Sequence, residues 1–300
     1  MPMQRNVHIV TDTGCSYRPE DAIVREHGIQ LIPLQLSILD NGSWTPKQET
    51  EIAPGQFYSI MARMIREDGE LPRTSGVNPG IARETYLRLL TQENTAGIVS
   101  VHITAAHSQA MNAARLGARE ALQTYAGNAR IEVVDSQQLT IGQWWLAAHA
   151  AQLAAQGAPL EQIAAEVKEM RTRVQVLAVL ENFENLKRGG RADQIKGRLA
   201  SILSALHIHP ILGFKDGKLD IFGRARNARK ARMRMADMAL ARGTLTHLAV
   251  LHTNAPELGD EMRQQLAGRY HGPIEMVDAG PVLAVHAGER AVGVASCTMS

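Results

Sequence analysis

Two adjacent hydroxyl side chains, Thr74 and Ser75, stand among prolines and glycines in the stretch LPRTSGVNPG at 71–80. Asn78 followed by Pro79 is typical of a helix start, where backbone N–H groups are left without helical partners. Hydroxyls beside such a helix end can donate hydrogen bonds to an anion. The density of turn formers predicts a loop here rather than a strand. Two hypotheses therefore stand side by side, an ordinary capped loop and an anion site.

Other hydrogen-bond donors follow predicted strands or precede predicted helices. Thr104 lies between an apolar run and an Ala-rich helix, so we expect its side chain to cap that helix. His286 lies in a predicted loop that contains Gly288 and could donate a ring N–H. Hydroxyl and N–H donors that converge on one anion suit a carboxylate. Each residue alone is explained by a local cap or a satisfied histidine, and only the set indicates a ligand.

A basic segment runs from 224 to 240, where we predict a single helix that carries Arg226, Arg229 and Lys230. One hypothesis is a solvated helix face whose arginine stems cover apolar surface. The other is a docking surface for an acidic or phosphorylated partner protein. The formal net charge of +2 and an aromatic content of 4% argue against nucleic acid as a partner.

Patterns typical of enzymes are scarce. The sequence contains no Gly-x-Ser-x-Gly and no Walker A motif, and its two cysteines predict neither a disulfide framework nor a metal site. We therefore expect no cofactor and no metal. An alternative hypothesis keeps an enzyme that acts on an acyl or small carboxylate substrate, in which Ser75, His286 and Asp12 would meet.

The elements that must position these residues alternate between strands and helices. A length of 300 residues predicts two domains. Over 1–157 the alternation predicts a three-layer α/β/α domain with a mostly parallel sheet. Ligands bind such sheets beyond the carboxyl ends of the strands, and we expect Asp12, Thr74, Thr104 and Asp135 to share that edge.

Over 158–300 strands and helices continue, with a hairpin turn at Asp216-Gly217, and predict a second α/β domain with a mixed sheet. We predict a helix at 195–206 and a loop from Gly280 to Gly288 in this half. No apolar run reaches the length of a membrane span, and no apolar signal region precedes the first predicted strand. We therefore expect a cytoplasmic protein.

The order of several motifs resembles the DegV family over nearly the whole chain. These motifs are VTDT at 10–13, PRTS at 72–75, VDS at 134–136, ENLKRGGR at 184–191, PIL at 210–212, and Gly280-Pro281 followed by His286-x-Gly288. The resemblance implies two α/β domains that bind a long-chain fatty acid in a slot between them. It also implies a carrier rather than an enzyme, which in some bacteria presents the fatty acid to a separate kinase.

By matching motifs, the resemblance implies that Thr74 and Thr104 hold the carboxylate with His286 beside them. Ser75 and Gly288 accompany them, Arg191 would lie near the cleft, and Arg226 would lie on the partner-facing side. Two segments depart from the family pattern. Thr104-Ala105-Ala106 replaces the common Ser-Gly-Thr, and Gly288-Glu289-Arg290 replaces the usual Gly-Pro-Gly.

Overall fold

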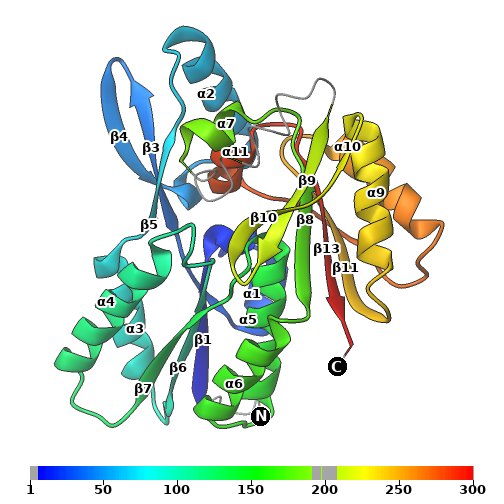
Figure 1. The fold of residues 1–300 in the computed structure, drawn as a ribbon. Coiled ribbons are helices and arrows are strands. Elements are labelled where there is room, and N and C mark those ends of the chain that lie inside the picture. Colours follow the sequence, from blue (N-terminus) through cyan, green and yellow to red (C-terminus); the bar gives the residue numbers. More distant parts are fainter. Residues whose placement is uncertain (1–5, 191–196, 198–207, 300) are drawn as a thin grey trace. The chain divides into compact units, whose positions relative to one another are not determined.

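The computed structural model describes residues 6–190, 197 and 208–299, and the chain divides into two compact units (Figure 1). Unit 1 comprises Met1–Leu36, Pro46–Glu51 and Thr74–Thr172, and unit 2 comprises Ser37–Thr45, Ile52–Arg73 and Arg173–Ser300. The sequence predicted a single boundary after residue 157. The chain instead passes between the units several times, because the hairpin tip Ser37–Thr45 and the helical segment Ile52–Arg73 of the first half belong to unit 2.

Unit 1 is built on a four-stranded sheet of order β2-β1-β6-β7 in which every pair is parallel. The strands are β1 (Val7–Asp12), β2 (Gln30–Ile32), β6 (Gly97–His102) and β7 (Arg130–Asp135). All six residues of the central strand β6 are buried, as expected of a strand covered on both faces. The prediction of a mostly parallel sheet is confirmed.

Helices cover both faces of this sheet (Figure 1). One layer contains α3 (Pro79–Leu90) and α4 (Ala110–Thr124), and the other contains α5 (Thr140–Ala155) and α6 (Leu160–Met170). The short helix α1 (Ala22–His27) packs on α5 and ends at Gly28, which has a φ of 59°. The predicted three-layer architecture is therefore present, and α6 belongs to it because it packs on β6, β7 and α5.

The strands β3 (Leu34–Asp40), β4 (Ser43–Gln48) and β5 (Arg73–Val77) form a separate sheet of order β4-β3-β5. Asn41 and Gly42 have φ angles of 48° and 76°, which is the conformation that a two-residue hairpin turn requires. The prediction that 71–80 forms a loop was wrong for 73–77. Pairing in this sheet supplies β5 with partners that local turn propensity does not report.

Unit 2 contains a mixed six-stranded sheet of order β10-β9-β8-β13-β11-β12, in which only β11 and β12 are parallel. The strands are β8 (Val174–Val179), β9 (His209–Lys215), β10 (Lys218–Ala225), β11 (Leu245–His252), β12 (Glu275–Asp278) and β13 (Val292–Thr298). Asp216 and Gly217 form the predicted hairpin turn. The prediction of a mixed sheet is confirmed.

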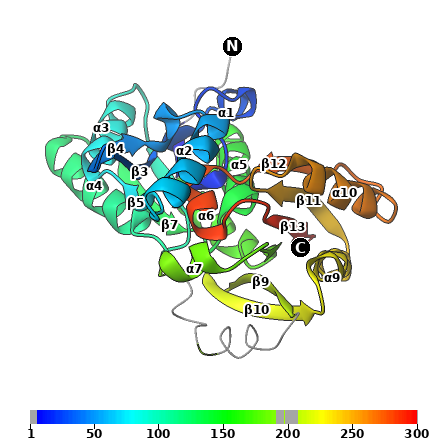
Figure 2. The ribbon, with the colours of Figure 1, turned by 90° about the horizontal axis from the view of Figure 1, so that it is seen from above.

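Two groups of helices belong to unit 2. The helices α9 (Ala228–Leu240) and α10 (Pro256–Ala267) pack on the sheet around a core that includes Met235, Met262 and Leu266. The other group is α2 (Pro54–Glu67), α7 (Glu184–Arg188) and α11 (Pro281–Ala287). Helix α11, which is orange-red in Figure 2, contacts both α2 and α7. No helix in the described part of the chain is long and apolar enough to cross a membrane.

Three predicted elements of unit 2 need correction or lie outside the described residues. The basic helix begins at Ala228 rather than at Arg224, because β10 continues in the antiparallel ladder through Ala225. The predicted loop from Gly280 to Gly288 contains helix α11, which Pro281 begins. The helix predicted at 195–206 falls outside the residues that the structure describes, apart from Gly197.

Candidate functional site

The candidate site of unit 1 lies at the carboxyl edge of its parallel sheet, where β1, β6 and β7 end. Asp12 ends β1, Thr104 follows β6, and Asp135 ends β7. The backbone N–H of Ile103 donates to Asp12 Oδ2 at 3.0 Å, and that of Ala105 donates to Asp135 Oδ1 at 3.2 Å. The two carboxylates thus hold the turn after β6 from both sides, as the shared strand edge predicted for Asp12, Thr104 and Asp135. Thr74 does not lie at this edge, because its strand β5 belongs to the separate sheet β4-β3-β5.

The carboxylate of Asp12 is fully buried and accepts four hydrogen bonds. Oδ1 accepts from Gly14 N at 2.9 Å and from Gln143 Nε2 at 3.0 Å. Oδ2 accepts from Ile103 N at 3.0 Å and from His102 Nδ1 at 2.8 Å. Buried charge is tolerated where several donors stabilise it. Asp12 therefore ties the ends of β1 and β6 to helix α5.

His102 continues this network into the core of unit 1. Its Nε2 lies 2.8 Å from Ser100 Oγ, which lies 2.8 Å from the phenolic oxygen of Tyr86. A neutral imidazole protonated on Nδ1 gives every donor an acceptor, whereas an imidazolium would leave one hydroxyl hydrogen without an acceptor. Burial raises the pKa of Tyr86, and the Asp12 carboxylate raises it further, while the hydrogen bond to Ser100 lowers it.

The order Ser100, His102, Asp12 is that of a hydrolase triad, yet all three side chains have no exposed surface. A nucleophile needs access to substrate, so the arrangement is structural. It also commits both oxygens of Asp12 to donors within unit 1. The hypothesis that Asp12 meets Ser75 and His286 therefore lacks a carboxylate oxygen that is not already hydrogen-bonded within unit 1.

Sequence reasoning did not single out His102, Ser100, Tyr86 or Gln143. Gln143 is a fully buried amide in a mostly apolar helix, and its Nε2 also donates to Thr11 Oγ1 at 2.9 Å. A single amide within the mostly apolar stretch 141–148 was the one available signal for this network. Ser100 and His102 lie two positions apart on β6, but their contacts with Tyr86 and Asp12 join different elements and carry no local pattern.

Thr104 is fully buried in the turn between β6 and α4. Its N–H donates to the carbonyl of Gln138 at 2.9 Å, and its own carbonyl accepts from His107 N at 3.3 Å. The prediction that Thr104 caps the following helix was wrong. That helix begins at Ala110, six positions later, because residues 105–107 form a separate turn.

Thr74 and Ser75 lie on strand β5, with Thr74 half-buried and Ser75 exposed. A Cβ atom added to Gly76 would lie 2.6 Å from the backbone N of Ala110, so β5 passes close to the start of α4. Asn78 caps α3 as predicted, since its Oδ1 accepts from Gly80 N at 2.8 Å. The strand with Thr74 therefore passes close to the start of α4, and the turn with Thr104 precedes the same helix in the chain.

His286 lies half-buried at the end of α11 in unit 2. A Cβ atom on Gly189 would lie 2.5 Å from His286 Nδ1, so the ring lies against the end of α7. Gly288 has a φ of 74°, and its carbonyl accepts from Thr253 Oγ1 at 2.7 Å. Asn185 Nδ2 donates to the carbonyl of Val285 at 3.1 Å. The segment around His286 is thus held firmly by residues of unit 2.

A family model described as "Uncharacterised protein, DegV family" matches residues 6–298. The chain belongs to the DegV family. A DegV domain-containing protein of Mycobacterium bovis is 30% identical over 292 residues, which cover 96% of this chain and 96% of the relative. The crystal structure of DegV from Bacillus subtilis, described as a fatty acid binding protein, is 25% identical and covers 99% of this chain and 100% of its own, with a TM-score of 0.82.

The DegV fold extends to more distant solved structures. A stearic-acid-binding protein from Eubacterium ventriosum is 22% identical, covers 97% of this chain and 98% of its own, and has a TM-score of 0.83. The α/β fold with a parallel sheet and a separate mixed sheet is therefore the fold of the DegV family. The family assignment that the sequence motifs indicated is confirmed.

The DegV motifs that depart from the family pattern have ordinary local contacts here. Glu289 Oε2 accepts from Asn254 Nδ2 at 3.0 Å, and Arg290 Nη1 donates to Glu257 Oε1 at 2.7 Å. A backbone hydrogen bond lowers the pKa of the exposed Glu257 carboxyl, and the hydrogen bond from Arg290 lowers it further. These side chains stabilise the loop after Gly288 at the surface of unit 2.

The basic residues predicted for partner docking are exposed. Arg226 lies in the bend between β10 and α9, and Arg229 and Lys230 lie in the first turn of α9. Asn227 caps that helix by accepting from Lys230 N at 2.9 Å. Arg191, predicted near the ligand, lies outside the described residues. The docking role of the others stays a prediction.

Proposed function

We propose that this protein binds a long-chain fatty acid and acts as its carrier. One observation carries the proposal: the whole chain matches a solved DegV protein at 25% identity, and that protein is described as fatty acid binding. Presentation of the fatty acid to a partner fatty acid kinase is the proposed purpose of the carrier.

We propose that Thr74 and Thr104 donate hydrogen bonds to the carboxylate, with Ser75 supporting them. The support is geometric, since β5 passes close to the start of α4 at Gly76 and the turn after β6 precedes that helix in the chain. Hydroxyl donors can bind a carboxylate without adding net charge. His286, Gly288 and Arg191 are further proposed contacts that rest on the family motifs, and each is testable by its own variant.

The acyl chain and the hydroxyls would contribute differently. Each buried methylene is worth about 0.8 kcal/mol, so ten of them supply at most about 8 kcal/mol before ordering costs. A hydrogen bond to a charged group contributes about 1.5–3 kcal/mol. The chain would therefore provide most of the affinity, and the hydroxyls would fix the position of the head group. Loss of one hydroxyl should disturb phosphoryl transfer more than it disturbs retention of the lipid.

Organic extraction of the purified protein followed by mass spectrometry tests the proposal. We expect about one C14–C18 fatty acid per chain. Thr104→Val keeps the side-chain shape, and Thr124→Val on the exposed face of α4 is the matched control. We expect Thr104→Val to weaken fatty acid binding by about tenfold or more and Thr124→Val to leave binding unchanged. Equal lipid content and equal acceptor activity with an added fatty acid kinase would refute the residue assignment.

The same experiment separates the carrier from the enzyme. Absence of any bound lipid, together with turnover of an acyl ester that Ser75→Ala abolishes, would support the enzyme hypothesis and overturn the carrier. His286→Ala would then abolish turnover as well. A carrier predicts that neither variant changes any hydrolytic activity, because none exists to be changed.

A further inference from the structure

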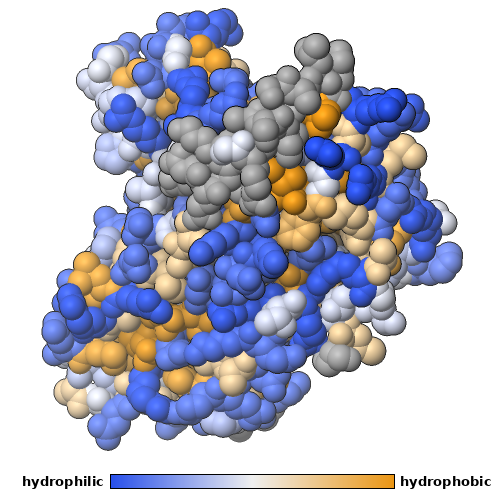
Figure 3. All heavy atoms as spheres, viewed as in Figure 1, coloured by the Kyte–Doolittle hydropathy of each residue, from blue (hydrophilic) through white to orange (hydrophobic). Residues whose placement is uncertain are grey.

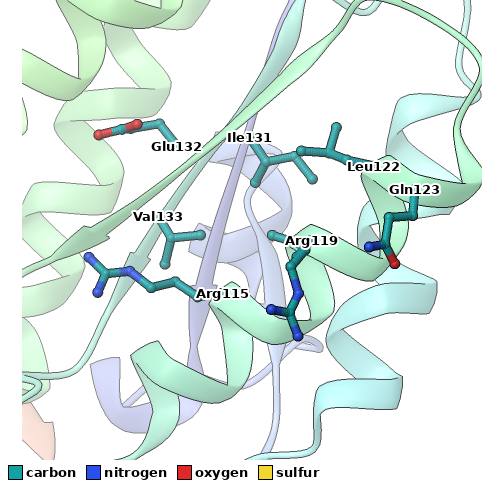
Figure 4. Close-up of a pocket in the computed structure, with 8 residues that line it drawn as sticks. Arg115, Arg119, Leu122, Gln123, Ile131, Glu132 and Val133 are labelled. Atoms are coloured by element: carbon teal, nitrogen blue, oxygen red, sulfur yellow. The ribbon is translucent and has the colours of Figure 1, made fainter.

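A shallow groove of about 560 Å³ lies between α4 and β7 in unit 1. Figure 4 shows Ile131 and Val133 on the side of β7 that faces α4, and Glu132 on the opposite side. Leu122 of α4 adds apolar surface and is 38% exposed. Figure 3 shows apolar side chains among hydrophilic ones at the lower left, where Figure 1 places α4 and β7. The groove thus has an apolar floor open to solvent.

The outer edge of β7 borders this groove and offers backbone hydrogen bonds. Arg130 N donates to Ala96 O and Ser136 N donates to His102 O, so the even-numbered residues of this segment face β6. The N–H and C=O groups of Ile131 and Val133 consequently point away from the sheet. No strand among the described residues pairs with that side of β7. Such an edge can accept an added strand.

Two arginines of α4 make the groove basic. Arg115 and Arg119 line it and have no ion-pair partner in the described part of the chain. The carboxylate of Glu132 is paired with Lys168 Nζ at 2.8 Å. Arg115 and Arg119 are one helical turn apart, about 6 Å along the axis, and alternate residues of a strand are about 6.6 Å apart. Two acidic side chains on one face of an extended segment match this spacing.

We propose that the groove binds an extended acidic segment of a partner protein, which pairs with the free edge of β7. Its two acidic side chains, two positions apart, would contact Arg115 and Arg119. An apolar side chain two positions further would lie over Leu122 and Ile131. The docking surface is independent of the fatty acid proposal, since none of its residues belongs to the proposed lipid site.

A fluorescein-labelled peptide, Thr-Glu-Thr-Glu-Thr-Leu-Thr, tests the proposal by fluorescence anisotropy with the full chain. We expect saturable binding that weakens as NaCl is raised, and none for the same peptide with Lys in place of Glu. Arg115→Glu/Arg119→Glu should weaken binding by about tenfold or more. The comparison variant Lys215→Glu/Lys218→Glu changes charge equally on the β9–β10 hairpin, where both lysines are exposed, and should alter binding by less than about twofold.

The strand-like mode has its own test at Val133. Val133→Pro removes the N–H that points outward and leaves the ladder with β6 intact, because proline is tolerated on an edge strand. Val133→Ala shortens the side chain but keeps the N–H, and thermal melts establish that both variants fold. We expect proline to weaken binding about tenfold more than alanine.

Three results would overturn the proposal. They are no detectable binding of the acidic peptide, equal binding by the Arg115→Glu/Arg119→Glu variant, and equal binding by the proline and alanine variants at 133. Sedimentation with phosphatidylglycerol vesicles tests whether the groove instead binds a membrane, the other source of negative charge. Vesicle binding that depends on Arg115 and Arg119, without peptide binding, would also overturn it.

Discussion

The substitution Asp12→Asn tests the buried network at the edge of the parallel sheet. An asparagine offers one carbonyl oxygen and one NH₂ group where the carboxylate offers two acceptor oxygens. Oδ1 and Oδ2 of Asp12 each accept two hydrogen bonds at 2.8–3.0 Å. Whichever way the amide turns, two donors face an NH₂ group.

The cost follows from the donors left without acceptors. With the amide oxygen at Oδ2, the N–H of Gly14 loses its acceptor, and one N–H of Gln143 keeps only the longer contact with the Asp12 carbonyl at 3.4 Å. With the oxygen at Oδ1, Ile103 N–H loses its acceptor, and His102 must move its proton to Nε2, which strands one hydroxyl hydrogen in the core. Each buried unsatisfied donor costs about 1–3 kcal/mol, so we expect a loss of about 2–6 kcal/mol in the free energy of unfolding.

Asp135→Asn is the matched control. Gln137 N and Ala105 N both donate to Oδ1 of Asp135, at 2.9 and 3.2 Å. An asparagine that places its oxygen there keeps both bonds, so we expect a change of less than about 1 kcal/mol.

Urea unfolding followed by tryptophan fluorescence measures both variants. Trp144 and Trp145 are buried in α5 and report on unit 1, and Trp44 of unit 2 is replaced by phenylalanine throughout. Losses in the free energy of unfolding that differ by less than about 1 kcal/mol between Asp12→Asn and Asp135→Asn would refute the hydrogen-bond accounting.

Three further predictions concern packing and titration. Gly117→Ala should lower the free energy of unfolding by about 1–3 kcal/mol, because its Cβ would lie 2.7 Å from a backbone oxygen of α3. The control Gly55→Ala adds its Cβ in open space and should not destabilise the protein. Equal urea midpoints for the two variants would contradict this prediction. Burial, followed by the Asp278 carboxylate, raises the pKa of Tyr58. Stability is therefore retained below the unfolded pKa near 10 and lost as pH rises above it, and Tyr58→Phe should remove about 1.4 kcal/mol per pH unit of that slope in pH-dependent urea unfolding. Burial also raises the pKa of Cys15, and Cys297 is buried, so a thiol reagent should label neither in the native protein at pH 8 and both in guanidinium; rapid native labelling would contradict the buried positions.

Short-range chemistry explains which predictions from the sequence succeeded. The turns at Asn41-Gly42 and Asp216-Gly217 need positive φ angles that their residue types tolerate, and the cap at Asn78 needs only the next three residues. The alternation of apolar runs with helical patterns similarly predicted both sheets and the three layers of unit 1. In each case the pattern that carries the prediction lies among residues close together in the sequence.

Contacts between distant residues explain the failures. Strand β5 was mistaken for a loop because its partner β3 lies more than thirty positions earlier. The helix after Thr104 begins later than its local signals suggested, because a separate turn held by Asp135 intervenes. The basic helix starts late because the ladder with β9 extends β10 to Ala225.

By itself the sequence determined the family and the α/β class, and it singled out the hydroxyls of Thr74 and Thr104 as the donors that we propose. Only the tertiary structure showed that Asp12, His102 and Ser100 form one sealed network, since the partners of Asp12 lie up to 131 positions away. The free edge of β7 beside Arg115 and Arg119 is likewise a property of strand order. Side chains carry their chemistry locally, but burial and an unpaired backbone edge exist only once the chain has folded.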